Sequence, residues 1–426
     1  MTRLAIIGTG YVGLTTGVCF AHLGHDVVCA DIDADKVARL GRGEVPIVEH
    51  RLDELLAEGL ASGNLRFVVG AAAAVAEAEI VFLCVPTPQG EDGSADLSYV
   101  EAAATEIAPV LAYEAIVVNK STVPVGSTRV VERVLQRPDV RVVSNPEFLR
   151  EGSAVDDFLR PDRVVVGCED RSAAIAVGAL YDSVRAQVIV TDPASAETIK
   201  YAANAFLATK LSFVNAIAAI CEGVGADVND VMVGMGYDKR IGAEFLRPGP
   251  GWGGSCFPKD SRALLNIAHE AGYRFDLLAG VIAVNDEQFE RVTDKIRVAA
   301  GGSLAGATIA VWGLTFKART DDLRDSPSLE IIHRLLAAGA TVQAFDPTVE
   351  GHKPGLPAEL KLHTDAVSAT IGAQVLAVLT EWDDFRWINP SEVAAVMAGR
   401  QVVDGRNLLD RTNWQRAGFS HTGIGR

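Results

Sequence analysis

One cysteine of the chain lies in a setting that suits covalent chemistry. Cys256 follows the run Gly253-Gly254-Ser255 and precedes Phe257-Pro258-Lys259-Asp260. The glycines let a substrate approach the sulfur closely, and the positive end of a helix beginning near Pro258 favours the nucleophilic thiolate. Asp260 lies four residues beyond Cys256, within one helical turn of the sulfur. On these residues alone, a buried cysteine in a glycine-rich loop remains the alternative.

Lys200 and Asn204 form a second candidate pair. They are four residues apart in a stretch predicted to be helical, and they therefore share one face of that helix. An ammonium group and an amide on one face can stabilise a developing oxyanion. Taken alone, Lys200 is better interpreted as a solvated surface lysine, and it is the cluster around Cys256 that favours a functional interpretation.

Two further polar residues follow predicted strands. Thr122 lies in Lys120-Ser121-Thr122-Val123-Pro124, and Glu147 lies in Asn145-Pro146-Glu147-Phe148-Leu149. Open parallel sheets bind ligands at the carboxyl ends of their strands, so both side chains are placed where a substrate would meet a cofactor. A helix-capping role for Glu147 and a turn role for Thr122 are equally consistent with these residues.

The N-terminus carries a dinucleotide-binding fingerprint. Gly8-Thr9-Gly10-Tyr11-Val12-Gly13 follows a predicted strand and opens a predicted helix. Gly8 permits a tight turn, Gly10 lets the backbone approach a pyrophosphate, and Gly13 allows close packing of helix on strand. Asp31 follows the second strand, where a carboxylate accepts from ribose hydroxyls and repels a 2′-phosphate. The pattern predicts NAD rather than NADP, and the alternative is an ordinary glycine turn with a surface aspartate.

These residues must be positioned by an alternation of strands and helices. The predicted strands of the first half are Leu4–Ile7, Val27–Ala30, Arg66–Val69, Ile80–Val85, Ala115–Asn119, Val140–Val143 and Arg163–Gly167. The predicted helices between them include Val12–Leu23, Leu97–Leu111 and Ser127–Gln136. Strands that are apolar along their whole length and separated by helices indicate a parallel sheet covered on both faces, as in Rossmann-type domains.

The pattern changes in the middle of the chain and then returns. Asp192-Pro193 can start a helix, and Ala194–Gly223 contains no proline or internal glycine, which predicts one unusually long helix. A glycine-rich passage at 249–254 and helical patterns from 260 to about 300 follow. Beyond Ala300-Gly301-Gly302-Ser303 the chain again alternates, with predicted strands Thr308–Trp312, Thr341–Phe345, Ala373–Leu379 and Gln401–Val403 and a predicted helix Ser328–Ala338.

We therefore predict an α/β protein with three parts. An N-terminal Rossmann-type domain that binds NAD covers residues 1–191, a helical central domain with the long connecting helix and Cys256 covers 192–300, and a smaller Rossmann-like domain covers 301–426. The two α/β parts make a coarse internal duplication, although no sequence repeat supports it.

The composition disfavours several classes of partner. Of the 426 residues, 49% are hydrophobic, and 39 basic against 55 acidic residues give a net charge of −16. A field of that sign repels nucleic acid and anionic lipid, so neither is an expected partner, and an anionic substrate must be held by local basic groups. Six cysteines are too few for a disulfide scaffold. Met1-Thr2-Arg3 leads into a strand without a secretory signal, which predicts a cytoplasmic protein, and no metal is expected.

Together, these motifs resemble those of the nucleotide-sugar 6-dehydrogenases, the UDP-glucose/GDP-mannose dehydrogenase family. The resemblance spans nearly the whole chain, because the motifs occur in the family's order. They are the N-terminal fingerprint, Lys120–Pro124, Asn145–Gly152, Arg247–Asp260, Gly313–Lys317 and Asp404–Asn407. The resemblance implies an NAD-dependent, four-electron oxidation of UDP-glucose to UDP-glucuronate, in two steps at the sugar C6.

The resemblance also implies a role for each catalytic candidate. Cys256 would add to the intermediate aldehyde, giving a thiohemiacetal and then a thioester that water hydrolyses. Lys200 and Asn204 would stabilise the oxyanion, and Asp260 with a bound water would serve as base. Glu147 would activate or orient the hydrolytic water, with Thr122 helping to hold it.

Binding roles follow in the same way. The implied NAD-binding residues are Gly8, Gly10, Tyr11, Val12, Gly13, Asp31, Lys36, Pro86, Thr87, Thr122, Glu151, Lys259 and Arg324. The implied substrate-binding residues are Glu147, Phe148, Leu149, Lys200, Asn204, Arg240, Phe245, Gly253, Lys317 and Arg406. Lys317 and Arg406 would form the basic pocket, and Arg240 would reach the substrate across a homodimer interface built on the helix Ala194–Gly223. Taken alone, each arginine is interpreted as a member of a surface ion pair, and only its position within the motifs favours a binding role.

Two alternatives stay open at this point. The chain could oxidise GDP-mannose or another nucleotide sugar, although Phe257-Pro258-Lys259-Asp260 favours the UDP-glucose branch, because the GDP-mannose branch tends to have leucine before the proline. It could also be a non-catalytic NAD-binding sensor on the same fold. Trp252 departs from the tyrosine or phenylalanine usual in UDP-glucose enzymes, and we expect it to act as an aromatic wall of the sugar pocket.

Overall fold

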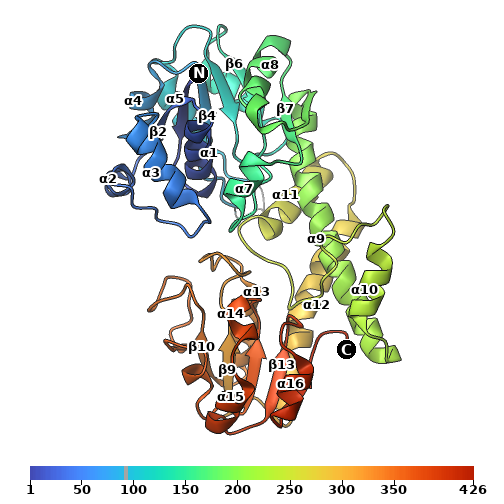
Figure 1. The fold of residues 1–426 in the computed structure, drawn as a ribbon. Coiled ribbons are helices and arrows are strands. Elements are labelled where there is room, and N and C mark those ends of the chain that lie inside the picture. The colour runs from blue at the N-terminus through green and yellow to red at the C-terminus, as the bar shows by residue number, and fades with distance from the viewer. Residues whose placement is uncertain (91–94) are drawn as a thin grey trace. The chain divides into compact units, whose positions relative to one another are not determined.

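The computed structural model describes residues 1–90 and 95–426, and these form two compact units (Figure 1). The first unit contains Met1–Ala203 and Arg262–Gly272, and the second contains Asn204–Ser261 and Tyr273–Arg426. Two helices, α9 (Pro193–Val224) and α11 (Phe257–Glu270), contribute residues to both units. The predicted α/β class with a helical middle is confirmed, whereas the division at residues 191 and 300 remains a prediction.

The first unit is built on an eight-stranded sheet with the order β3-β2-β1-β4-β5-β6-β7-β8. The strands are β1 (Arg3–Ile7), β2 (Asp26–Asp31), β3 (Leu65–Val69), β4 (Ile80–Leu83), β5 (Ile116–Asn119), β6 (Arg141–Ser144), β7 (Val164–Gly167) and β8 (Val188–Thr191). The helices are α1 (Tyr11–His22), α2 (Ala34–Gly41), α3 (Leu52–Ser62), α4 (Ala71–Val75), α5 (Ser98–Ile107), α6 (Ser127–Leu135), α7 (Ala154–Leu159) and α8 (Arg171–Ala179). Strands β1 to β6 run parallel, so the turns that follow β1, β4, β5 and β6 lie at one edge of the sheet.

Helices cover both faces of this sheet. Leu4 and Ile6 of β1 pack into one buried cluster, and Ala5 and Ile7 of the same strand pack into another. Because successive side chains of a strand point to opposite faces, a strand buried on both sides must be apolar at every position. This is the physical reason for the continuous apolar runs in the sequence.

The predicted parallel sheet is confirmed for β1 to β6, whereas the strand predicted at Arg163–Gly167 departs from it. Strand β7 runs antiparallel to β6, and β8, which the sequence analysis missed, runs parallel to β7. Parallel neighbours need a crossover, usually a full helix that packs on the sheet. After β6 the chain instead forms an irregular loop up to residue 153 and the six-residue α7, which is too short for such a crossover.

The long helix α9 has 32 residues, as the absence of glycine and proline predicts. By length and composition alone it could cross a membrane, with a mean hydropathy of 1.4 over its most apolar window. Its polar side chains, however, bond within the protein: Ser212 Oγ donates to Val281 O over 2.8 Å, and Asn215 Oδ1 accepts from Gly249 N over 2.9 Å. Polar residues of α9 therefore fix neighbouring segments of the protein.

The second unit contains a smaller sheet with the order β11-β10-β9-β12-β13-β14, all of it parallel. The strands are β9 (Thr308–Trp312), β10 (Thr341–Phe345), β11 (Lys361–Leu362), β12 (Val375–Val378), β13 (Gln401–Asp404) and β14 (Ser420–Thr422). The helices are α10 (Val228–Gly236), α12 (Asp276–Ala299), α13 (Pro327–Ala337), α14 (Asp383–Arg386), α15 (Pro390–Val396) and α16 (Arg411–Arg416). The sequence analysis missed β11 and β14, which have two and three residues.

Buried amide side chains of α12 hold the glycine-rich loop that leads to Cys256. Asn285 accepts from Trp252 N and donates to Trp252 O, over 2.8 and 2.9 Å. Gln288 Nε2 donates to Gly249 O over 2.7 Å. A loop outside any sheet must find partners for its buried backbone groups, and these two side chains supply them. Hydrogen bonds from α12 therefore fix the backbone of this loop.

Candidate active site

The turn after β1 places three glycines in three different environments. Gly8 has a φ of +95°, and a Cβ on it would lie 2.6 Å from the Cys84 carbonyl oxygen. A Cβ on Gly13 would lie 1.9 Å from the Gly8 carbonyl oxygen. Around the Cβ position of Gly10, by contrast, no described atom lies within 4 Å. The protein's own backbone requires Gly8 and Gly13, whereas Gly10 leaves room for a ligand at the N-terminus of α1.

Asp31, at the end of β2, faces this turn. Its Oδ2 accepts from Thr9 N (2.9 Å), Thr9 Oγ1 (2.5 Å) and Lys36 Nζ (3.0 Å). Burial by itself would raise the pKa of Asp31, but these hydrogen bonds outweigh it and lower the pKa to about 2. Its Oδ1 accepts a longer bond of 3.2 Å from Asp33 N. Asp31 is therefore an ionised acceptor beside the open Gly10, which suits the ribose of a dinucleotide.

The loops after β4 and β5 are bonded to each other. Thr87 Oγ1 donates to Thr122 O over 2.9 Å, and Ser121 Oγ donates to Val85 O over 2.6 Å. Three residues predicted to bind NAD, namely Pro86, Thr87 and Thr122, are thereby brought together at the carboxyl edge of the sheet.

Glu49, which was not among the predicted site residues, belongs to the same region. Its buried carboxylate accepts a hydrogen bond from the Tyr11 hydroxyl, and Gly152 N donates to both the Tyr11 oxygen and Glu49 Oε2, over 2.8 Å each. Burial and the adjacent Glu49 raise the pKa of Tyr11, so the phenol stays protonated. Glu49 thus ties the start of α1 to the loop that carries Glu147. A carboxylate at the end of the apolar run 45–48 was the available signal.

Glu147 and Lys200 form a buried ion pair in the first unit. Lys200 Nζ lies 2.7 Å from Glu147 Oε1, and Leu149 N donates to Glu147 Oε2 over 2.6 Å. Burial by itself would raise the pKa of Glu147, but the Lys200 charge and these hydrogen bonds outweigh it and lower the pKa. The ring of Phe148 contacts two cations, with Arg163 3.7 Å and Lys200 Nζ 5.4 Å from its centre. Glu147 is therefore held as a carboxylate.

In the second unit, Cys256 directly precedes α11. Its carbonyl accepts from Asp260 N over 2.8 Å, which is the bond that opens the helix. The Asp260 carboxylate is fully buried, with Asn204 Nδ2 2.6 Å from Oδ2 and Lys259 Nζ 2.5 Å from Oδ1. Ser255 Oγ lies 3.6 Å from Cys256 Sγ. A thiol at a helix N-terminus is therefore followed, one turn later, by a carboxylate that positions an amide.

The loop before Cys256 rests on the segment that follows β9. A Cβ on Gly253 would lie 1.9 Å from Asp325 O, and Gly254 N donates to that same oxygen over 3.3 Å. Gly254 has a φ of +83°, and a Cβ on it would lie 2.8 Å from the Phe316 ring. Both glycines are thus required by close packing within the protein. Gly253 was predicted to contact the substrate, and the supporting roles of Phe316 and Asp325 were not predicted.

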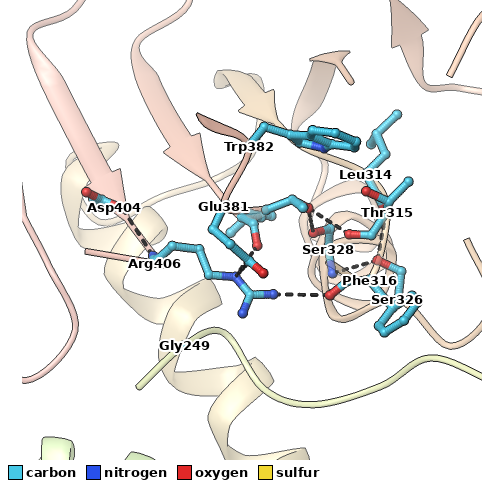
Figure 2. A network of polar contacts seen from close by, with 12 residues as sticks. Gly249, Leu314, Thr315, Phe316, Ser326, Ser328, Glu381, Trp382, Asp404 and Arg406 are labelled. Atoms are coloured by element: carbon cyan, nitrogen blue, oxygen red, sulfur yellow. Dashed lines mark hydrogen bonds and ion pairs between the residues drawn. The ribbon is translucent and has the colours of Figure 1, made fainter. Parts of the chain in front are cut away.

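Arg406, two residues beyond the end of β13, forms hydrogen bonds and an ion pair within the second unit (Figure 2). Its Nε donates to Leu379 O over 2.8 Å, with Glu381 Oε2 3.0 Å from the same nitrogen, and Nη2 donates to Phe316 O over 3.2 Å. A Cβ on Gly249 would lie 3.1 Å from Nη1, so a glycine there leaves space for the guanidinium. The basic group expected for a diphosphate therefore has an acidic neighbour, Glu381.

Two other predicted arginines lie on the surface of the second unit. Arg240 pairs with Asp238 and Arg324 pairs with Asp322, each over 2.6 Å. The Arg240 side chain is 89% exposed, so the ion pair screens little of its charge from water. Within a single described chain, Arg240 therefore contacts Asp238 at the surface, and a role at the substrate would need a second copy of the chain.

Aromatic residues surround the start of α11. The Phe257 ring lies 6.4 Å from the rings of both Phe245 and Trp252. Trp252 is buried, and its indole N–H donates to Ser212 Oγ over 2.8 Å. Trp252 supports the loop from inside, which differs from the open aromatic wall expected of it. Lys317 Nζ lies 5.4 Å from the centre of the Phe316 ring, on the segment that supports the loop.

Three family profiles match the chain in succession. The NAD binding domain of the UDP-glucose/GDP-mannose dehydrogenase family matches residues 2–185, its central domain matches 194–287, and its UDP binding domain matches 310–411. A UDP-glucose 6-dehydrogenase of Rhizobium meliloti (strain 1021) is 45% identical over 434 residues, which is 100% of this chain and 99% of that protein.

Solved structures of the same family are similar over the full length. A UDP-glucose dehydrogenase from Pyrobaculum islandicum superposes with a TM-score of 0.92 at 37% identity, covering 100% of this chain and 98% of that one. A UDP-D-ManNAc dehydrogenase from Pyrococcus horikoshii superposes with a TM-score of 0.89 at 28% identity, covering 100% and 99%. The fold is therefore shared by relatives whose names give different sugars.

Proposed function

Because the chain belongs to the UDP-glucose/GDP-mannose dehydrogenase family, we propose that it oxidises the C6 hydroxyl of UDP-glucose to the carboxylate of UDP-glucuronate, with two molecules of NAD. One observation carries the mechanism. Cys256 directly precedes α11, whose first turn holds Asp260 bonded to Asn204. A thiol at a helix N-terminus suits the capture of an aldehyde, which a dehydrogenase that stops at the carbonyl does not need.

The residues of the first unit fit NAD, which accepts a hydride in each oxidation. The open position at Gly10 and the N-terminus of α1 would hold the pyrophosphate, and the ionised Asp31, fixed by Lys36, would hold the adenosine ribose. The same negative charge would repel the 2′-phosphate of NADP. The remaining proposed contacts to NAD are Tyr11, Val12, Pro86, Thr87, Thr122, Glu151, Lys259 and Arg324.

The first oxidation needs a base and a group that stabilises the developing oxyanion. Asp260, through a water, takes the proton of the C6 hydroxyl while the hydride leaves. Lys200 and Asn204 donate hydrogen bonds to the oxygen as it gains negative charge. They lie one helical turn apart on α9, so both side chains leave the same face of that helix.

The second oxidation proceeds on the enzyme. The Cys256 thiolate adds to the aldehyde carbon and forms a thiohemiacetal, and loss of the second hydride converts it into a thioester. Water then attacks the thioester, which releases the carboxylate and regenerates the thiol. Glu147, held as a carboxylate, accepts the proton of that water, with Thr122 helping to hold it. Covalent capture keeps the aldehyde from escaping between the two oxidations.

Basic groups of the second unit would hold the diphosphate against the net charge of −16. Lys317 and Arg406 are the proposed contacts, and a diphosphate would compete with Glu381 for the Arg406 guanidinium. The backbone of Phe148 and Leu149, the Phe245 side chain and Gly253 are the further proposed contacts to the substrate.

The activity is tested by following NADH production with a panel of nucleotide sugars. We expect two NADH per molecule of UDP-glucose, and little or none with GDP-mannose or UDP-N-acetylmannosamine. Fast turnover of one of these sugars without turnover of UDP-glucose would move the assignment to that substrate. NAD binding without NADH formation from any sugar would instead indicate a non-catalytic sensor.

The covalent step is tested with Cys256→Ser. The variant should lose steady-state formation of UDP-glucuronate, because an unactivated hydroxyl cannot carry the thioester chemistry. Cys168→Ser, which removes a partly buried thiol in the first unit, is the matched control and should keep full activity. Four-electron oxidation by Cys256→Ser at the wild-type rate would refute the covalent mechanism.

A cytoplasmic homodimer completes the proposal. Phe206, Phe213 and Ile220 recur at intervals of seven on α9, and their exposures are 66, 49 and 58%. Such an apolar stripe is suited to a second copy of the same helix, and it would let Arg240 reach the substrate of the partner subunit. Light scattering should give twice the monomer mass, and Phe213→Asp should weaken association. A monomer at micromolar concentration would contradict the dimer.

A further inference from the structure

We propose that Lys120 is a positioning residue that keeps Glu147 ionised during hydrolysis of the thioester. The inference rests on the proposed function, and it assigns a role to a buried charge that the mechanism above does not use. Lys120 directly follows β5, at the carboxyl edge of the first unit's sheet.

The Lys120 ammonium lies in a closed network of neutral groups. It is 4% exposed, and its Nζ donates to Asn145 Oδ1 over 3.1 Å and to the Tyr181 hydroxyl over 3.3 Å. The Tyr181 hydroxyl donates to the same Asn145 oxygen over 2.9 Å, and Asn145 Nδ2 donates to Val165 O over 2.7 Å. Across residues 1–90 and 95–426, no carboxylate forms an ion pair with Lys120.

A buried ammonium without an ion pair is costly to fold. Desolvation disfavours the charged form of a lysine, and a methionine of similar length would fill the same space without that penalty. Burial lowers the pKa of Lys120 to about 8, while the nearby Cys84 and Glu147 oppose this shift and Lys200 adds to it. Lys120 is thus cationic at neutral pH in a site that resists charge, and packing alone does not explain the choice of lysine.

The position of the network connects Lys120 with Glu147. Asn145, which Lys120 contacts, lies two residues before Glu147 on the loop after β6. The Lys120 charge also lowers the pKa of Glu147, after the larger contribution of Lys200. The charged or titratable groups that face Lys120 are therefore Glu147, Lys200, Cys84 and Tyr181.

Two cations near one carboxylate have a use in the proposed reaction. Lys200 is paired with Glu147 over 2.7 Å, yet the mechanism also directs Lys200 to the oxyanion on the substrate. When Lys200 turns to that oxyanion, the stabilisation of the Glu147 carboxylate decreases. Lys120, fixed by Asn145 and Tyr181, keeps its charge in place. Glu147 can then remain ionised and accept the proton of the attacking water.

The pH profile of Lys120→Met tests this inference. Loss of the charge should raise the pKa of Glu147, so the midpoint of the acid limb of kcat should rise by about one pH unit, with about tenfold lower kcat below both midpoints. Tyr181→Phe removes one hydrogen-bond acceptor but keeps the lysine, so its acid limb should stay where that of the wild type is. An unmoved acid limb in Lys120→Met would overturn the inference.

Two measurements separate this inference from the proposed function and from a merely structural role. Infrared difference spectra between each protein and its Glu147→Gln counterpart report the carboxyl titration without substrate, and the midpoint should be higher in Lys120→Met. That titration decides about Lys120 even if UDP-glucose is not the substrate. Thermal unfolding of Lys120→Met should occur at or above the wild-type temperature, because Tyr181 and Asn145 still bond to each other. Marked destabilisation with an unchanged Glu147 titration would show a structural lysine instead.

Discussion

The turn after β1 and the turn after β9 have the same backbone geometry. In both sheets the first strand lies between the second and the fourth. Both first strands are followed directly by a glycine of positive φ, +95° at Gly8 and +94° at Gly313. In each case the glycine N–H donates over 2.8 Å to the second strand, from Gly8 to Ala30 O and from Gly313 to Phe345 O. Two segments without a detectable sequence repeat thus form the same local structure.

The acidic residues at the carboxyl ends of the second strands, Asp31 and Asp346, differ in their surroundings. Asp31 is partly accessible, and its Oδ1 accepts one long bond from Asp33. Asp346 is 2% exposed, and its Oδ2 accepts from Leu314 N, Thr315 N and Trp382 Nε1, while Thr348 donates to Oδ1. Both carboxylate oxygens of Asp346 therefore accept hydrogen bonds from the protein and leave no acceptor capacity for ribose hydroxyls.

The chain after each glycine also differs. Gly10 leads directly into α1, whereas after Gly313 the chain runs irregularly to Ser326, which caps α13. That irregular segment carries Lys317 and supports the loop of Cys256 through Phe316 and Asp325. The same turn therefore leads to an open helix N-terminus in one unit and to a segment that supports the loop of Cys256 in the other. Fold similarity alone does not make a dinucleotide site.

Among substitutions that test this comparison, those of glycine should have the largest effects on stability and on NAD affinity. Gly13→Ala places a Cβ 1.9 Å from Gly8 O, and we expect the free energy of unfolding to fall by about 3 kcal/mol. Gly10→Ala meets no described atom, and the extended backbone of residue 10, with a φ of −66° and a ψ of −172°, is accessible to residues with a Cβ. Unfolding should therefore be nearly unchanged while NAD affinity falls about tenfold or more. Thermal unfolding and NAD titration measure both. Equal destabilisation of the two variants would remove the distinction between a packing glycine and a ligand glycine.

Asp346→Asn should have the next largest effect, a loss of about 2 kcal/mol in unfolding free energy. An amide group cannot accept from all the N–H groups that converge on this carboxylate. The KM for NAD should stay within about twofold of the wild type, since other residues hold the dinucleotide. Denaturant unfolding and steady-state kinetics check this pair of outcomes. A tenfold rise in the KM for NAD without destabilisation would show that Asp346 is more than a structural acid.

Asp31→Asn should have the opposite pattern, with a larger effect on the KM for NAD than on stability. The KM for NAD should rise about tenfold, or about 1.4 kcal/mol, because a charged acceptor for the ribose is lost. The unfolding free energy should fall by about 1 kcal/mol, since Thr9 keeps an oxygen acceptor. The ratio of activity with NADP to that with NAD should rise as the repulsive charge disappears. If NADP discrimination stayed intact, Asp31 would not be the selecting residue.

Lys36→Met should give the smallest effect, about a twofold rise in the KM for NAD. Lys36 contributes one of the bonds that lower the pKa of Asp31 to about 2, so its loss raises that pKa. A lowered carboxyl pKa gives stability that is present above the unfolded value and is lost as pH falls through the folded value. The onset of this loss is set by the unfolded value and does not change, but in Lys36→Met the loss should be smaller and should be complete at a higher pH. Unfolding curves at falling pH test this, and a shift toward lower pH would contradict it.

Much of the fold and part of the site were predictable because they depend on neighbours in sequence. The apolar runs indicate strands buried on both faces, and the absence of glycine and proline predicts α9. The spacing of Lys200 and Asn204 places them on one helix face, and Cys256 four residues before Asp260 places the thiol at a helix N-terminus. The direction of β7 was not predictable, since apolar runs do not reveal which way a strand returns.

The sequence by itself determined the glycine turn of the first unit, the acid at the end of β2 and the cysteine before α11, because local backbone conformation depends on residues within a few positions. Only the tertiary structure decided what each residue touches. The Asp325 carbonyl leaves no room for a side chain at Gly253, and the Trp382 indole donates to the Asp346 carboxylate. The Lys120 ammonium donates to Asn145 and Tyr181. These partners are distant in sequence, and burial by distant segments decides whether a polar group is free for a ligand or used by the protein.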